Sequence, residues 1–135
     1  AVGDRVPLHC TALGKAMLAS LPDHAVRRII EQVGLPTFTE HTITDPASLQ
    51  QELERIRARG FSTDHEEHER RTFCIGASIL DAHGCVVGAC SVSGTDPAIV
   101  GSRLEALAAE VMGTAEEASR RMGYVPHRLS QINRG

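Results

Sequence analysis

Two apolar, β-prone runs joined by a short polar turn constrain the fold of this chain more than any other feature. The runs cover residues 73–80 and 85–93, and Asp81-Ala82-His83-Gly84 connects them. Asp at the first turn position and Gly at the fourth are typical of a type I turn closed by a left-handed glycine. The sequence therefore predicts an antiparallel hairpin with a three-residue loop.

Helical patterns lie on both sides of the predicted hairpin. They predict helices over about 12–20, from Pro22-Asp23 to Gly34, from Asp45-Pro46 to about Arg59, and over 104–122. Thr11 and Asp45 are placed to cap the first and third helices, and Gly34, Gly60 and Gly123 end the second, third and last helices. A brief strand is expected over 61–64, a charged loop over 65–71 and a polar tail over 125–135.

Apolar residues at helical spacing predict which side of each helix is buried. The expected buried positions are Val26, Ile29, Ile30 and Val33 in the second helix, Leu49, Leu53 and Ile56 in the third, and Leu104, Leu107, Ala108, Val111, Ala115, Ala118 and Met122 in the last. The charged run Glu52, Glu54, Arg55, Arg57 and Arg59 is interpreted as a solvated face. Helices followed by a hairpin and a closing helix indicate an α+β fold in which helices cover an antiparallel sheet.

Composition excludes several classes of function. A chain of 135 residues that is 41% hydrophobic can bury one core, which indicates one domain. A net charge of -3 argues against DNA binding by this chain alone, and 3% aromatic content argues against base stacking. Cys10, Cys74, Cys85 and Cys90 have no paired metal-type spacing, and no apolar run is long enough for a membrane span, so free thiols in the cytoplasm are expected.

Two groups of donors can bind an anion. Alternation along 85–93 puts the hydroxyls of Ser91 and Ser93 on one face, where they can clamp a carboxylate. The amides of Ala12 and Leu13 begin the first helix, where free N–H groups and the helix dipole favour negative charge. The alternatives are that the serines simply end a strand near a turn, and that every helix has such an N-terminus.

Asp64 and Cys74 lie at the ends of predicted strands, where functional sites are often built. Asp64 can accept from a ligand hydroxyl, whereas the alternative is that Asp64 caps a turn and Cys74 is a small buried hydrophobe. A metal site using Asp64, Cys74 and a histidine is a second alternative, although the spacing matches no compact motif. A hydrolase is a third, but no nucleophile and base can be paired and no Gly-x-Ser-x-Gly elbow occurs.

Four segments, taken together and in this order, resemble the effector domain of IclR-type transcription regulators. They are Leu8-His9-Cys10-Thr11-Ala12-Leu13-Gly14-Lys15-Ala16, residues 60–68 (GFSTDHEEH), Cys74-Ile75-Gly76-Ala77, and residues 81–94 ending in Ser91-Val92-Ser93-Gly94. The resemblance covers about residues 8–124, which is nearly the whole chain.

The resemblance implies a GAF-like antiparallel sheet domain over residues 1–124 that binds a small organic acid. It implies that the first strands of this sheet are missing here, and that a separate N-terminal winged helix-turn-helix, also absent, binds operator DNA. It further implies a dimer or tetramer, no cofactor and no enzymatic activity.

The pocket positions carried over by the resemblance are Ala12, Leu13, Asp64, Cys74, Ser91 and Ser93. Apolar side chains such as Met17 would select the shape of the effector, with a place in the core as the alternative for Met17.

Two features depart from the family pattern. Arg71 stands where the family usually has Gly, and its cation either favours a dicarboxylate or aromatic acid or faces water. In addition, the expected turn pairs Cys74 with Val92, on the face away from the serines. Either a bulge at Gly76 or Gly88 corrects this register, or Cys74 is not a pocket residue.

Overall fold

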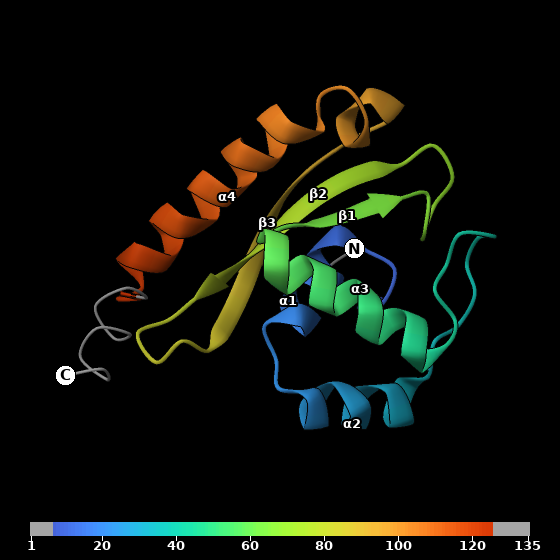
Figure 1. Ribbon diagram of the computed structural model, residues 1–135, viewed down its shortest axis with the longest axis horizontal. Coiled ribbons are helices and arrows are strands. Elements are labelled where there is room, and N and C mark those ends of the chain that lie inside the picture. Colours follow the sequence, from blue (N-terminus) through green and yellow to red (C-terminus); the bar gives the residue numbers. More distant parts are fainter. Residues whose placement is uncertain (1–6, 126–135) are drawn as a thin grey trace, which may run out of the picture.

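A three-stranded antiparallel sheet lies between two layers of helices in the computed structural model, which describes residues 7–125. In chain order the elements are α1 (Ala12–Ala19), α2 (Asp23–Val33), α3 (Pro46–Arg59), β1 (Ser62–His65), β2 (Phe73–Leu80), β3 (Val86–Gly94), the 3-10 helix η1 (Pro97–Val100) and α4 (Leu104–Arg121). The sheet order is β1-β2-β3, with α4 on one face and α1 and α3 on the other (Figure 1). The predicted α+β class is confirmed.

The helix boundaries agree with the sequence pattern because the capping signals act locally. Thr11 accepts from the Gly14 amide at the start of α1, and Asp45 accepts from the Ser48 amide at the start of α3. β1 begins one residue later than predicted. η1 was not predicted, although Asp96-Pro97 repeats the Asp-Pro start signal of α3. Within the described residues, each helix is too short or too polar to span a bilayer.

A bulge in the hairpin sets the register of the whole sheet. The turn has the predicted geometry, since the Gly84 amide donates to the Asp81 carbonyl and Gly84 has a φ of 76°. Leu80 pairs with Val86 but Ile79 pairs with Gly88, so that Val87 is an extra residue on β3. The predicted pairing of Cys74 with Val92 is therefore wrong: Cys74 lies opposite Ser93. Of the alternatives, a bulge beside Gly88 is the one that the structure contains.

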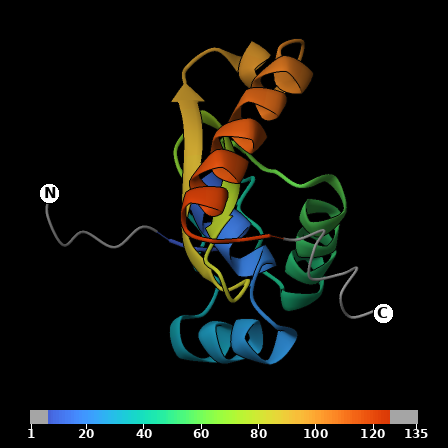
Figure 2. The ribbon, with the colours of Figure 1, turned by 90° about the vertical axis from the view of Figure 1, so that its left-hand side faces the viewer.

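Two apolar clusters hold the layers together. Phe73, Ile75 and Ala77 of β2 pack against the buried side of α4, which Ala108, Val111 and Ala115 provide. The second cluster joins α1, α2 and α3 through Leu18, Val26, Leu49, Leu53 and Ile56. α2 is the outermost layer of this cluster and lies away from the sheet (Figure 2).

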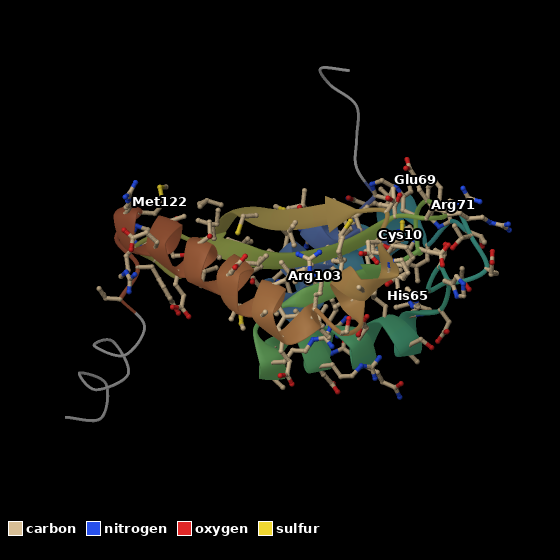
Figure 3. The ribbon with its side chains drawn as sticks, turned by 90° about the horizontal axis from the view of Figure 1, so that it is seen from above. Cys10, His65, Glu69, Arg71, Arg103 and Met122 are labelled. Atoms are coloured by element: carbon tan, nitrogen blue, oxygen red, sulfur yellow. The ribbon has the colours of Figure 1, made fainter. Side chains whose placement is uncertain are left out.

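Three predictions of burial are wrong. Val33 is 64% exposed because it lies in the last turn of α2, which packs through its middle residues. Met122 is 49% exposed because α4 ends before it, at the outer end of the molecule (Figure 3). Glu52 is not solvated but pairs with a buried lysine. The predicted polar tail lies outside the described residues, except for the exposed Val125.

Candidate functional site

The bulged register brings polar side chains from three strands onto one face of the sheet. Asp64 pairs with Cys74, which pairs with Ser93, and directly paired residues share a face. The next row on the same face is Ser62, Gly76 and Ser91. With strands about 4.8 Å apart, Asp64 and Ser93 stand about 10 Å from each other across the row.

The first turn of α1 lies over this face. The Ser62 hydroxyl donates to the Ala12 carbonyl, and a Cβ atom at Gly76 would lie 2.8 Å from the Ala12 carbonyl oxygen. Only a glycine at position 76 allows this approach. The amides of Ala12 and Leu13 have no partner among the hydrogen bonds of residues 7–125, whereas Thr11 occupies the Gly14 amide. We call Ala12, Leu13, Asp64, Cys74, Ser91 and Ser93 the sheet-face site.

Solvent reaches the two sides of the sheet-face site differently. Asp64 is 2% exposed and accepts from the Glu67 amide at 2.8 Å, and Cys74 is also buried. Ser91 and Ser93 are exposed, and the Ser93 hydroxyl donates to the Cys74 sulfur at 3.0 Å. The prediction that Cys74 and the serines share a site is thus consistent with the observed geometry, although the predicted register was not.

Burial changes the ionisation of the groups in this site. The pKa of Asp64 is raised to about 6, mainly by desolvation; the hydrogen bond from the Glu67 amide and the charge of Lys15 lower it, and the charge of the Glu67 carboxylate raises it. Desolvation also raises the pKa of the Cys74 thiol. A raised pKa disfavours the thiolate, which is the nucleophilic form, so this environment does not favour the hydrolase alternative.

Met17 is half-buried and belongs to neither apolar cluster of the described residues. Leu13 lies one turn earlier on the same side of α1 and is also half-buried. The two side chains therefore form an apolar strip that begins at the free amides, which fits a pocket wall better than the core.

The sequence interpretation missed the charged residues beside the site. Lys15 is 0% exposed, and its ammonium binds Glu67 at 2.8 and 2.9 Å and Glu52 at 2.8 Å. Cys10 is fully buried nearby, and desolvation followed by the charge of Asp64 raises its pKa to about 12. A lysine within the apolar run of α1 was the signal that a buried carboxylate partner exists.

Arg71 does not point into the sheet-face site. It is exposed, and its side chain extends from the end of the molecule together with Glu69 (Figure 3). Its φ is 60°, in the left-handed region that favours glycine, which gives a physical reason for the glycine of the family pattern. Of the two alternatives, Arg71 faces water.

Other candidate sites receive less support. Within residues 7–125, no group of three or more His, Cys, Asp and Glu side chains can hold a metal ion, so the convergence that the metal alternative requires is not found there. A hollow of about 670 Å³ lies elsewhere, between β2 and the end of α4, and is lined by residues such as Ser78, Met112 and Tyr124. It contains none of the residues of the sheet-face site.

Comparison with known proteins identifies the class of protein. The family model for the bacterial transcriptional regulator IclR C-terminal domain matches residues 1–120. This fold is therefore that of the C-terminal domain of a bacterial transcriptional regulator. The chain belongs to the IclR family, as its four sequence segments indicated.

Individual relatives agree with this assignment. The HTH-type transcriptional repressor AllR of Escherichia coli K12 is 36% identical over 126 residues, which are 93% of this chain and 46% of AllR. The crystal structure of Thermotoga maritima IclR matches 92% of this chain and 50% of that chain, with 37% identity and a TM-score of 0.86. The chain thus spans about half the length of the curated relatives it matches.

A third relative was solved with a ligand. It is the inducer-binding domain of a PobR double mutant from Acinetobacter, in complex with 3-hydroxybenzoic acid. It matches 88% of this chain and 69% of that chain, with 29% identity and a TM-score of 0.73. Like AllR, the IclR protein of Escherichia coli K12, which is 34% identical over 118 residues, is named as a transcriptional repressor.

Proposed function

We propose that this chain senses a small organic acid at the sheet-face site. The observation that supports this proposal is that the free amides of Ala12 and Leu13 begin a helix directly over the sheet face that carries Ser91 and Ser93. Helix N-termini and hydroxyls are donors that bind carboxylates well, because the backbone dipoles favour negative charge.

The remaining groups define the rest of the effector. Asp64 accepts a hydrogen bond from a hydroxyl of the effector, and Leu13 and Met17 contact its apolar part. The ligand of the PobR relative has the expected combination of a carboxylate, a hydroxyl and an apolar ring. This similarity supports an acid of that general kind without identifying the effector of this chain.

A thermal-shift screen tests the proposal. The panel contains acetate, succinate and 3-hydroxybenzoate, with benzamide as an uncharged comparison. An acid present at about 100 times its Kd stabilises the native state by roughly 2.7 kcal/mol, which raises Tm. We expect a saturable shift with at least one acid and none with benzamide.

Two variants assign the shift to the sheet-face site. Ser91→Ala together with Ser93→Ala should weaken binding of the responding acid about tenfold or more, because two hydrogen bonds to a charged group are lost. Ser102→Ala, at an exposed serine, is the matched control and should leave binding unchanged. Unchanged affinity in the double variant would remove the serines from the site, and no shift with any acid would contradict the organic-acid class.

In the whole protein, we propose that binding changes the affinity of an N-terminal winged helix-turn-helix domain for operator DNA. The effector binds one arrangement of a cytoplasmic homodimer or homotetramer more tightly and so shifts the population. Operator binding by the full-length protein, measured with and without the responding acid, tests this step. Equal affinities would contradict it.

A further inference from the structure

A buried cluster of charges lies directly behind the sheet-face site. Lys15 of α1 is 0% exposed and its ammonium contacts Glu67 of the 66–72 turn and Glu52 of α3. Both partners are themselves largely buried, with side-chain exposures of 9% and 12%. α1 and α3 lie on the same side of the sheet (Figure 1), so that one ammonium links three separate segments.

Buried ion pairs are a poor source of stability, because desolvation of both charges offsets their attraction. Apolar side chains of similar volume stabilise a core equally well or better. The contacts of Lys15 connect α1 with α3 and with the 66–72 turn.

Lys15 is also connected to Asp64, through Glu67. The Glu67 amide donates to the Asp64 carboxylate at 2.8 Å, and the Glu67 carboxylate accepts from the His65 amide at 3.3 Å. Glu67 therefore braces the turn around Asp64 with its backbone and with its side chain. Lys15 holds that side chain with two contacts, and its own helix begins three residues earlier at Ala12.

We propose that Lys15 is a positioning residue for the sheet-face site: through Glu67 it holds Asp64 at a fixed place relative to the free amides at the start of α1. The inference rests on the proposed function in one respect. If the site binds an acid, the distance from Asp64 to the amides of α1 sets the distance between the hydroxyl and the carboxylate of the effector. The contacts themselves do not depend on it.

The pKa of Asp64 distinguishes a positioning role of Lys15 from a general contribution to the stability of the core. The charge of Lys15 lowers the pKa of Asp64 and the charge of the Glu67 carboxylate raises it, while the hydrogen bond from the Glu67 amide lowers it and is kept in side-chain variants of Glu67. Lys15→Met should therefore raise the pKa of Asp64 above about 6, whereas Glu67→Gln should lower it. General loosening of the core would let water reach Asp64 in both variants and move both values in the same direction.

The experiment is a carbon-13 NMR titration of the Asp64 carboxyl, combined with hydrogen exchange of the Glu67 amide, in this chain and its variants. We expect opposite shifts of the Asp64 pKa in Lys15→Met and Glu67→Gln. We also expect the Glu67 amide to exchange at least about tenfold faster in both variants, because its hydrogen bond opens more often, although the bond remains closed most of the time and still lowers the Asp64 pKa. Glu52→Gln is the matched control, since it removes the contact of Lys15 with α3 and leaves the contact with Glu67.

Each outcome decides the proposal. If Lys15→Met leaves both the Asp64 pKa and the Glu67 amide unchanged, or if Glu52→Gln accelerates that amide as much as Glu67→Gln does, Lys15 does not position Asp64. If Lys15→Met fails to fold, the comparison of Glu67→Gln with Glu52→Gln carries the test alone. This experiment contains no effector, so its result is independent of acid binding. Lys15 can fail to position Asp64 in a domain that binds an acid, and it can position Asp64 in a domain that binds none.

Discussion

Asp64 has a carboxyl that the fold holds away from water, and this makes stability depend on pH in a defined direction. Its pKa rises from 3.8 to about 6 on folding, mainly through desolvation. The groups that face it are Lys15 from α1, Glu67 and His68 from the turn, and the thiols of Cys10 and Cys74. A raised carboxyl pKa means that the native state binds the proton more tightly than the unfolded state does.

We predict that this contribution to the free energy of unfolding is present below about pH 4 and is lost as the pH rises to about 6. The difference between 3.8 and about 6 corresponds to on the order of 3 kcal/mol, at about 1.36 kcal/mol per pH unit. In Asp64→Asn the contribution is absent, so the variant should gain stability relative to the native chain between pH 4 and pH 7. Urea unfolding at several pH values measures this difference.

The exposed Glu54→Gln is the control for this comparison. Parallel pH profiles for the native chain and Asp64→Asn would show that the Asp64 carboxyl is not desolvated in the folded state.

At the scale of elements, the site depends on how closely α1 approaches β2. A Cβ atom at position 76 would lie 2.8 Å from the Ala12 carbonyl oxygen, 2.9 Å from its carbonyl carbon and 2.9 Å from the Ser62 hydroxyl oxygen. The first two are backbone atoms, and the hydroxyl is held by its hydrogen bond to the Ala12 carbonyl. We predict that Gly76→Ala lowers the free energy of unfolding by about 1–3 kcal/mol, because the first turn of α1 must move. The shift of the urea midpoint at constant m-value measures the loss.

Gly88→Ala is the matched control for this substitution. Gly88 also lies in the sheet, but nothing stands within 4 Å of an added Cβ atom there. The control should lose no stability, since alanine restricts the unfolded chain more than glycine does. Equal losses at the two positions would mean that a general preference for glycine, and not the approach of α1, governs Gly76.

At the scale of the whole molecule, net charge bears on whether this chain binds DNA by itself. The net charge is -3 over 135 residues, and non-specific DNA binding depends on neutralising phosphates with cations. We predict that this chain alone binds duplex DNA more weakly than about 10⁻⁴ M near physiological salt. Fluorescence anisotropy of a labelled duplex at two salt concentrations measures it, and a tight, salt-dependent signal would assign DNA contacts to this domain.

Local sequence signals determined most of the elements of this protein. Thr11 and Asp45 cap helices with their own side chains, and Gly84 closes the hairpin with a positive φ, so each of these features depends on a few neighbouring residues. The resemblance of four segments to the IclR family could also be recognised from the sequence, because it depends only on residue identity and order. The candidate positions of the sheet-face site followed from both sources.

Only the tertiary structure decided which of these residues meet. The extra residue at Val87 moved Cys74 from opposite Val92 to opposite Ser93, and a shift of one residue exchanges the two faces of a strand. Lys15 in an apolar helical run signals a buried partner, but nothing local identifies that partner as Glu52, 37 positions away, or Glu67, 52 positions away. Burial and register depend on what packs against a residue from a distant part of the chain, which no local pattern contains.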